Sequence, residues 1–137
     1  MLKVEHIGIA VKDLVAGNAL FEVLLGVAPY KEEAVESEQV RTSFFQVADT
    51  KIELLEAMDP SSAIARFLEK RGEGIHHVAF EVADIVQAME SLREKGFRVL
   101  NEVPKRGADN KLVCFIHPGS ANGVLVELCQ TIKPELP

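Results

Sequence analysis

Apolar and polar positions alternate over several short stretches of this chain, a period of two that is typical of β-strands with one buried face. The alternation is clearest at residues 7–11 and 78–82, where every second side chain is apolar. The same kind of pattern predicts further strands at residues 41–47, 51–56, 97–103, 112–117 and 123–130, and another near residues 27–31.

Three other segments carry apolar residues at a helical period. One begins after Asp13 and a second after Asp84, and each stops at a glycine. The carboxylates of these two aspartates are expected to accept hydrogen bonds from the free N–H groups of the first helical turn. The third segment, at residues 61–71, ends at a Gly-Glu-Gly sequence and is predicted to be a linker helix.

An internal repeat organises these elements. Residues 4–14 align with residues 75–85, and apolar residues, a histidine and an aspartate recur in register. Each copy is expected to fold as a strand, a helix and three further strands. We therefore predict one α+β domain over residues 1–137, with module one at residues 1–57, a linker helix within residues 60–73 and module two at residues 74–131.

Four residues with metal-binding side chains are predicted to share one face of the sheet. Because side chains alternate along a strand, the apolar row of each strand identifies the opposite face. That face holds His6 and Glu53 in module one, and His77 and Glu127 at the matching places in module two. If the modules pair about a pseudo-twofold axis, these side chains meet in one cleft. Two imidazoles and two carboxylates suit a divalent ion such as Zn, Mn, Fe, Co or Ni.

Two further histidines and a basic segment have possible roles near this site. His76 precedes His77, and strand alternation places it on the opposite side, as a surface residue or as support for a ligand. His117 is expected to mark a turn before Pro118, with a substrate contact as the alternative. Basic residues at positions 105–111 are expected either to meet an anionic substrate or to lie in a solvated loop.

Composition narrows the class of partner. Lys and Arg number 15 against 21 Asp and Glu, which gives a net charge of -6 and makes nucleic acid an unexpected partner. No apolar run approaches the roughly 20 residues that cross a bilayer, and the N-terminus lacks the features of a signal peptide. A cytoplasmic protein without a membrane partner is expected. Cys114 and Cys129 stand in apolar runs, as reduced and packed thiols do.

Several stretches resemble the vicinal oxygen chelate superfamily and, within it, the methylmalonyl-CoA epimerase family. They are residues 4–13, 49–56, 67–82, 115–120 and 123–128. The first is shared across the superfamily, whereas the helix that leads into His76 and His77 and the segment around His117 are more specific to the epimerases. The resemblance implies two tandem modules that form a half-barrel sheet around a metal cleft.

The resemblance also implies an activity. It is that of an isomerase that interconverts (2R)- and (2S)-methylmalonyl-CoA by metal-assisted proton transfer at C2 through an enolate. It implies an acyl-CoA substrate, a homodimer, and a divalent ion (Co, Mn, Zn or Ni) held by His6, Glu53, His77 and Glu127.

The acid/base groups follow partly from the resemblance. Glu127 carries over as both a ligand and a proton-transfer group. Thr42 stands where some family members have a glutamate that serves as the second group. Glu53, a water molecule or a loop carboxylate such as Glu38 is left to fill that role.

Other classes share the scaffold. A glyoxalase I-like lactoylglutathione lyase also moves a proton beside a chelated oxygen, and it is an alternative, as is another metal-dependent enzyme of the superfamily. An extradiol dioxygenase uses two His and one Glu around Fe(II), and a fourth protein ligand would leave it fewer open positions. An antibiotic-binding protein favours an aromatic groove, whereas this chain has no Trp and one Tyr.

Overall fold

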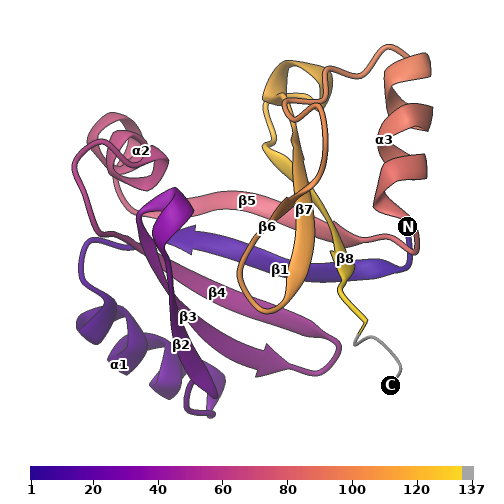
Figure 1. The fold of residues 1–137 in the computed structure, drawn as a ribbon. Helices are drawn as coiled ribbons and strands as arrows, with labels where there is room; N and C mark the ends of the chain where they lie inside the picture. Colours follow the sequence, from indigo (N-terminus) through magenta and orange to yellow (C-terminus); the bar gives the residue numbers. More distant parts are fainter. Residues whose placement is uncertain (134–137) are drawn as a thin grey trace.

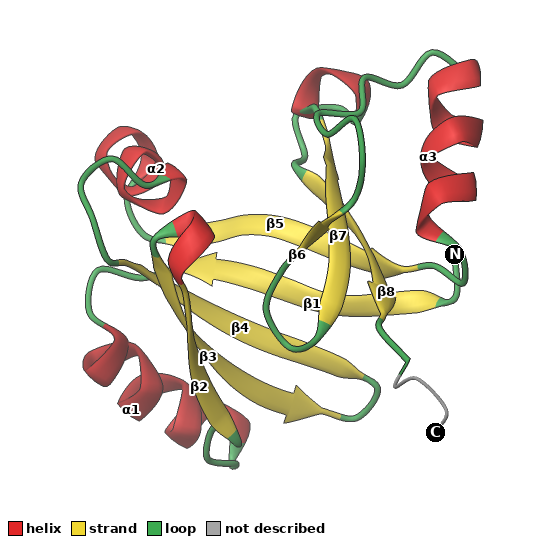
Figure 2. Cartoon of the chain, viewed as in Figure 1, coloured by secondary structure: helices red, strands yellow, loops and turns green. Residues whose placement is uncertain are grey.

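A single curled sheet of eight strands runs through the molecule, and helices pack on its outer faces and across one end (Figure 1, Figure 2). The computed structural model describes residues 1–133. The elements, in chain order, are β1 (Lys3–Ala10), α1 (Leu14–Leu25), β2 (Lys31–Val35), η1 (Glu36–Glu38), β3 (Val40–Val47), β4 (Thr50–Ala57), α2 (Ala63–Arg71), β5 (Gly74–Glu81), α3 (Ile85–Glu94), β6 (Lys105–Arg106), β7 (Lys111–Ile116), η2 (Pro118–Ser120) and β8 (Val126–Thr131).

The strand order shows how the two halves join. The sheet runs β2-β3-β4-β1-β5-β8-β7-β6, so β1 and β5, the first strands of the two halves, lie side by side and antiparallel. Each pairs on its other edge with the last strand of its own half in parallel, β1 with β4 and β5 with β8. The curled sheet is a half-barrel, as the vicinal oxygen chelate resemblance implies (Figure 1). Its concave face receives side chains from both halves.

Two β-bulges interrupt the pairing of β1 with β5. In β1 the register passes from Val4 to His6, so Glu5 is the extra residue. In β5 the partners of Gly8 and Ile9 are His77 and Ile75, so His76 is the extra residue. A bulge suspends the alternation of side chains at one position. The bulges lie at equivalent places in the internal repeat, and each directly precedes a histidine of the predicted metal site.

N-terminal capping residues set where the helices begin. Asp13 accepts hydrogen bonds from the N–H groups of Val15 and Ala16, and Asp84 accepts one from Gln87, as expected for capping residues. At the start of α2 the cap is Ser62. Replacing such a cap by alanine costs about 1 kcal/mol.

The apolar rows of the first strands pack against helices, so the opposite row is left for the concave face. Helix α1 packs Phe21 and Leu25 against Ile9 and its neighbours, and α3 packs Ile85 and Met89 against the outer face of the second half. Helix α2 covers one end of the concave face, where Ile64 meets Ala10, Val40 and Leu55.

Two predicted strands are wrong in position. Residues 97–103 do not form a strand: Val99 makes one isolated bridge to Ile116, and the short strand β6 comes later, at Lys105–Arg106. The side-chain oxygen of Asn101 accepts the N–H of Phe115, which replaces a backbone bond of a regular ladder. The strand expected near residues 27–31 begins only at Lys31, beyond Pro29, which has no N–H to donate.

The remaining predicted elements agree with the structure to within four residues at their ends, since β1 and β5 begin at Lys3 and Gly74, four residues before the stretches of clearest alternation. Strand β8 begins at Val126 and not at Gly123, since Gly123 has a positive φ of 86° in a turn. Cys114 and Cys129 are buried and free. Within residues 1–133, none of the helices combines the length and the apolar character that crossing a bilayer requires.

Candidate active site

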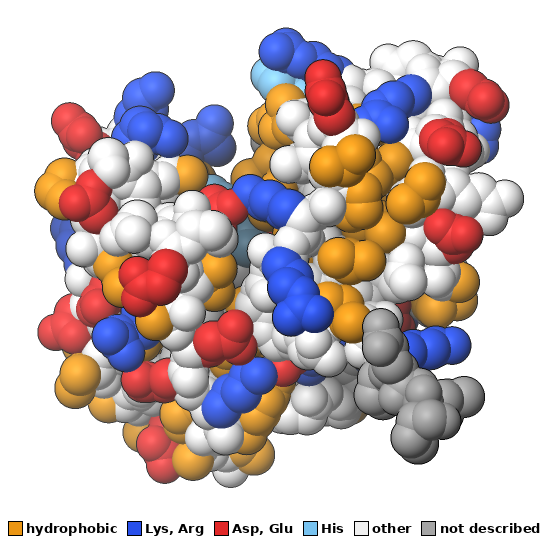
Figure 3. All heavy atoms as spheres, in the orientation of Figure 1, with side chains coloured by type: hydrophobic (Ala, Val, Ile, Leu, Met, Phe, Trp, Pro, Cys, Tyr) orange, Lys and Arg blue, Asp and Glu red, His pale blue; other side chains and the backbone are white. Residues whose placement is uncertain are grey.

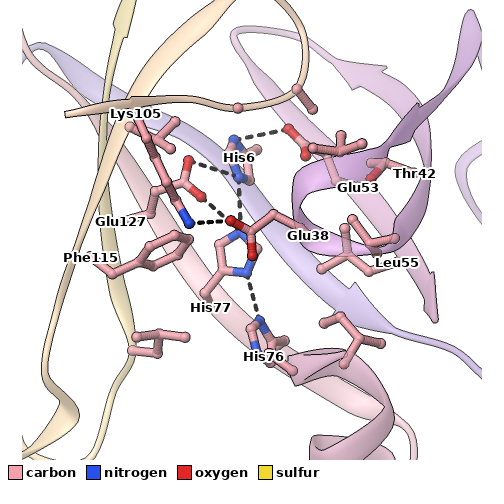
Figure 4. Close-up of a pocket in the computed structure, with 18 of the residues that line it drawn as sticks. His6, Glu38, Thr42, Glu53, Leu55, His76, His77, Lys105, Phe115 and Glu127 are labelled. Carbon is pink, nitrogen blue, oxygen red and sulfur yellow. Dashed lines mark hydrogen bonds and ion pairs between the residues drawn. The ribbon is translucent and has the colours of Figure 1, made fainter. Parts of the chain in front are cut away.

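A cavity of about 350 Å³ lies on the concave face between the two halves. The space-filling view shows a hollow between two lobes with histidine atoms deep inside it (Figure 3). All four predicted site residues, His6, Glu53, His77 and Glu127, line this cavity, and each is at most 6% exposed. They come from β1, β4, β5 and β8, so both halves contribute an imidazole and a carboxylate (Figure 4).

Three of the four residues form a compact cluster. The Nε2 atoms of His6 and His77 face each other at 2.9 Å. Each of these nitrogens lies 3.5 Å from a carboxylate oxygen of Glu127. Two imidazole nitrogens and a carboxylate thus point at one small volume, as Figure 4 shows.

Glu53 occupies a different position around His6. Its Oε2 lies 2.9 Å from Nδ1 of His6, on the ring edge that faces away from His77. The structure therefore gathers His6, His77 and Glu127 into one group of potential ligands, and Glu5, His6 and Glu53 into a second. The expected meeting of all four donors at one point is not seen in this arrangement.

The residue before each histidine supports its ring. Glu5 Oε1 lies 2.9 Å from Nδ1 of His6, and Nδ1 of His76 lies 2.9 Å from Nδ1 of His77. Both supporting residues are the extra residues of the β-bulges, which turn them to the same side as the histidine that follows. The expectation that His76 points to the opposite side is wrong for this reason, and His76 also lines the cavity.

These contacts define the tautomers. We assign a proton to Nδ1 of His6, which it donates to Glu5 and Glu53, and a proton to Nδ1 of His77, which it donates to His76. The Nε2 atoms, which face the cluster, are then the nitrogens available to an ion. Contacts of this kind fix the orientation of metal-binding histidines and raise their basicity.

The pKa values of the two histidines are shifted in opposite directions. Burial alone would lower the pKa of His6, but hydrogen bonds to Glu5 and Glu53 raise it to about 10. Burial also holds the pKa of His77 well below its usual value, and the nearby His6 acts in the same direction. The neutral His77 can therefore accept the hydrogen bond that the protonated His6 donates from Nε2.

Two of the carboxylates around His6, Glu127 and Glu5, differ in their pKa values. Burial raises the pKa of Glu127 to about 8, because desolvation outweighs the attraction of His6. Glu5 is as buried, but hydrogen bonds from His6 and Lys51 outweigh burial and lower its pKa to about 2. At neutral pH His6 is therefore protonated and Glu5 is ionised, while burial favours the protonated form of Glu127.

The donor set fits a divalent cation. Ligands bound at 2.0–2.1 Å to one ion lie roughly 2.9–3.4 Å apart at octahedral or tetrahedral angles, close to the 2.9 and 3.5 Å separations within the cluster. A cation would also take the place of the protons that now hold the acidic and imidazole groups together. His6, His77 and Glu127 are the residues that would bind it, and Glu53 could join through a side-chain rotation.

Gly8 makes this approach of the two histidines possible. It pairs with His77 across the β1–β5 seam. A Cβ atom at position 8 would lie 2.2 Å from Cε1 and 2.6 Å from Nδ1 of His77. Only a residue without a side chain leaves room for the imidazole.

The mouth of the cavity carries further polar groups. Thr42 faces the cavity and is 1% exposed, but its hydroxyl is not an acid/base group at neutral pH. Glu38 of η1 and Lys105 of β6 form an ion pair across the opening, so each half supplies one partner (Figure 4).

A loop of the second half is held to the first half by lysines. Asp109 binds Lys31 at 2.7 Å and also binds Lys51, and Lys51 lies 3.0 Å from Glu5. Gly107 and Ala108 of the same loop line the cavity. The basic loop residues therefore have separate roles: Lys105 faces the cavity, whereas Lys111 is buried and lies 4.0 Å from Glu5.

Sequence reasoning missed Glu5 as a residue that supports the site, and it offered support of a ligand as one role for His76 but placed that residue on the wrong side of the strand. The repeat contained a signal for them, because the two positions align between the copies, each just before a histidine. His117 forms the start of η2, where its Nδ1 accepts the N–H of Gly119, and it does not line the main cavity.

Comparisons with known proteins extend these observations. The model of the Glyoxalase/Bleomycin resistance protein/Dioxygenase superfamily matches residues 5–115. The ethylmalonyl-CoA/methylmalonyl-CoA epimerase of Cereibacter sphaeroides is 43% identical over 130 residues, which cover 93% of this chain and 97% of that protein.

Solved structures show the same similarity in three dimensions. The methylmalonyl-CoA epimerase of Mycobacterium tuberculosis superposes with a TM-score of 0.91 at 36% identity, over 95% of this chain and 88% of the other. A methylmalonyl-CoA epimerase in complex with methylmalonyl-CoA and NH4+ also gives a TM-score of 0.91, at 34% identity over 100% of this chain and 99% of the other.

Proposed function

The chain belongs to the Glyoxalase/Bleomycin resistance protein/Dioxygenase superfamily, and from this membership and its epimerase relatives we infer that it is an isomerase acting on methylmalonyl-CoA. It interconverts the (2R) and (2S) epimers by removing the proton at C2 and returning one to the opposite face. The structural observation that carries the proposal is the buried His6–His77–Glu127 cluster at the floor of a cavity that both halves line.

We propose that His6, His77 and Glu127, with Glu53 as the fourth ligand, hold a divalent ion such as Co, Mn, Zn or Ni. When bound, such an ion supplies Lewis-acid stabilisation of the negative charge that develops on the thioester and carboxylate oxygens. The chain itself prepares the site by directing both Nε2 lone pairs inward. Glu5 and His76 hold the rings in that orientation.

Glu127 is proposed as one proton-transfer group. A general acid/base works best when its pKa is near the working pH; burial raises the pKa of Glu127 to about 8, and a bound cation would lower it from that value. The ionised carboxylate accepts the C2 proton, and the electron pair of the C–H bond moves into the enolate. When the reaction runs from the other epimer, protonated Glu127 donates its proton to C2 of the enolate.

Glu53 is proposed as the second proton-transfer group. It lies at the opposite ring nitrogen of His6 from Glu127, so the two carboxylates flank the cavity floor from different halves. Inversion at C2 requires one group on each face of the planar enolate. Glu38 at the mouth is the competing candidate, because Thr42 offers no carboxylate.

The test is exchange of the C2 hydrogen of methylmalonyl-CoA with solvent deuterium, measured on protein loaded with Co or Mn. Loaded wild-type protein should exchange the hydrogen, and Glu127→Gln should reduce the rate by about 100-fold or more, since general acid/base catalysis contributes 10²–10⁴-fold. The second group is identified by comparing Glu53→Gln with Glu38→Gln. The variant whose exchange rate falls about as much as that of Glu127→Gln lacks the second group. Normal exchange in a His77→Ala, Glu127→Ala double variant would refute the site.

A parallel assay tests the alternative class. The hemithioacetal of methylglyoxal and glutathione is the substrate of a glyoxalase. Turnover of this compound without exchange of the CoA ester would refute the epimerase proposal. Both assays use the same metal-loaded protein, so loss of folding cannot account for a difference between them.

We also propose that two chains associate through α1. Its inner face packs on the sheet, yet its outer face is apolar as well: Val15 and Val23 are at least 80% exposed, and Leu20 and Leu24 are 59% and 67% exposed. Several large apolar side chains exposed on one helix mark a site of protein–protein interaction. Light scattering should report a dimer for the wild type and a monomer for Val23→Glu, and a monomeric wild type would contradict the proposal.

A further inference from the structure

The turn between β6 and β7, residues 107–110, lies against the first half of the chain, and we call it the hairpin tip. Asp109 and Asn110 both have positive φ angles there, of 58° and 57°. Aspartate and asparagine adopt this conformation more readily than other residues that carry a side chain. Two such residues in succession are still costly unless contacts hold them in place. The shape of the hairpin tip therefore depends on its contacts.

The side chain of Asp109 binds three donors of the first half. Its Oδ1 lies 2.7 Å from Nζ of Lys31, and its Oδ2 accepts hydrogen bonds from Lys51 and from the hydroxyl of Tyr30. The backbone N–H of Asp109 also donates to a carboxylate oxygen of Glu33 at 3.1 Å. Hydrogen bonds to an ionised group are stronger than neutral ones. One carboxylate of the second half is thus the point at which the hairpin tip is attached to the first half.

Asn110 attaches the hairpin tip on its other side. Its side-chain Nδ2 donates to the carbonyl of Ile132 at 3.1 Å, and its own carbonyl accepts the N–H of Ile132 at 3.0 Å. The two preceding residues of the tip, Gly107 and Ala108, line the main cavity. The wall that the tip supplies to the cavity is therefore held by Asp109 on one side and by Asn110 on the other.

Lys51 connects Asp109 to the histidine cluster. Its ammonium group lies between two carboxylates, that of Asp109 and that of Glu5, whose Oε2 is 3.0 Å away. The other oxygen of Glu5 accepts the Nδ1 proton of His6 at 2.9 Å. The side chains of Asp109, Lys51 and Glu5 are only 18%, 13% and 2% exposed. Because buried charges are screened far less than exposed ones, a change at Asp109 should be felt along this row of contacts.

We propose that Asp109 is a positioning residue of the candidate metal site and acts on His6 through Lys51 and Glu5. The proposal rests on the proposed function, because it assumes that His6 binds the ion. Asp109 shares the charge of the Lys51 ammonium with Glu5. Without that share the full positive charge acts on Glu5, which becomes a weaker acceptor for the Nδ1 proton of His6. The Nε2 atom of His6 is then a weaker donor to a cation.

The first test needs no metal. Metal-free protein containing ¹⁵N-labelled histidine gives an NMR signal for the Nδ1–H proton of His6, identified by its loss in His6→Gln. The position of this signal reports the strength of the hydrogen bond to Glu5. Asp109→Asn should move the signal upfield, and Asp109→Glu, which keeps the charge, should move it less. An unchanged signal in Asp109→Asn would overturn the inference.

The second test is a double-mutant cycle on the affinity for Co(II), measured by the visible absorption of the bound ion. Asp109→Asn should lower the affinity about fivefold in the wild-type background and less than about twofold in the Glu5→Gln background, as for residues coupled in one network. The second loss is smaller because the effect passes through Glu5. Equal losses in the two backgrounds would overturn the inference, since Asp109 would then act only as a distant charge.

Lys31 provides the matched control. Within residues 1–133 its ion pairs are with Glu33 and Asp109, and neither leads to His6. Lys31→Met removes one attachment of the hairpin tip but keeps the pair of Asp109 with Lys51. It should lower the urea midpoint slightly, as loss of an exposed ion pair does, and leave the His6 signal and the Co(II) affinity near those of the wild type. A loss of affinity as large as that of Asp109→Asn would overturn the positioning role, because attachment of the tip alone would explain both.

The outcomes separate this inference from the proposed function. A wild type that binds Co(II) but does not exchange the C2 hydrogen refutes the epimerase activity, while the His6 signal and the affinity cycle still decide the role of Asp109. A wild type that exchanges the hydrogen, together with an Asp109→Asn variant that changes neither readout, refutes the positioning role and supports the activity. A wild type that does not bind Co(II) overturns the metal site and this inference with it.

Discussion

Replacing Gly8 by alanine should disrupt the candidate metal site without unfolding the protein. The new Cβ atom would lie 2.2 Å from Cε1 of His77, about 1.2 Å short of the 3.4 Å at which ordinary contact begins. The imidazole must therefore move by about that amount or rotate. It has little room, because it is 5% exposed and is surrounded by His6, His76 and Phe115.

The size of the effect follows from that displacement. A misplacement of about 1 Å at a reacting centre costs roughly 10²-fold in rate, so exchange of the C2 hydrogen in Gly8→Ala should fall by about that factor. Overpacking of this kind costs about 1–3 kcal/mol of folding free energy. The loss of metal affinity should therefore exceed what the change in stability explains.

The assay titrates Co(II) into the protein and follows the visible absorption of the bound ion, with urea unfolding measured on the same preparation. The control is Gly17→Ala in α1, where the new Cβ would lie 3.3 Å from a flexible Leu54 methyl. That variant should keep its metal affinity and gain up to about 1 kcal/mol from helix propensity. Metal affinity and exchange within threefold of the wild type in Gly8→Ala would refute the close-approach argument.

The other predictions concern the groups around the cluster. Glu5→Gln should weaken metal binding about 10- to 100-fold, as loss of a supporting contact does, measured by competition with a chelating dye. The same variant should also change how stability depends on pH, because the pKa of Glu5 falls to about 2 on folding. Ionised Glu5 therefore stabilises the fold above pH 4.5, by up to about 3 kcal/mol. This contribution disappears as the pH falls toward 2. The free-energy difference between the two proteins should therefore shrink in urea titrations at successively lower pH. Metal affinity should rise with pH from pH 6 upward, because Glu127, with a pKa of about 8, and His6, with a pKa of about 10, must both give up a proton; calorimetry in two buffers should detect proton release, and its absence would contradict the assignment. Asp84→Ala should lower the free energy of unfolding by about 1 kcal/mol and leave metal affinity unchanged, as measured by the same dye.

Sequence reasoning works here where the polypeptide is regular. The alternation along each strand was enough to place His6, His77, Glu53 and Glu127 on the concave face. The aspartate caps likewise identify where α1 and α3 begin. These inferences depend only on short-range periodicity, which the sequence records directly.

It fails where one residue departs from that periodicity. The bulges at Glu5 and His76 turn these side chains toward the histidines, and hydrophobic alternation contains no direct sign of such an insertion. Asn101 replaces a ladder bond with a side-chain bond, so the apolar stretch around it does not become a strand. The position of Glu53 on the outer nitrogen of His6 depends on side-chain torsion angles, which no pattern along the chain specifies.

The matched bulges have a consequence for how a ligand would be oriented. Because the backbone of the two halves is nearly equivalent around β1 and β5, identical side chains there would offer a small ligand two interchangeable poses. The chain supports one imidazole with an anion, Glu5, and the other with a neutral aromatic ring, His76. The two histidines thus differ in electron donation although their backbones correspond. The symmetry of the duplication is broken by chemistry, so an unsymmetrical ligand would meet two distinguishable sides.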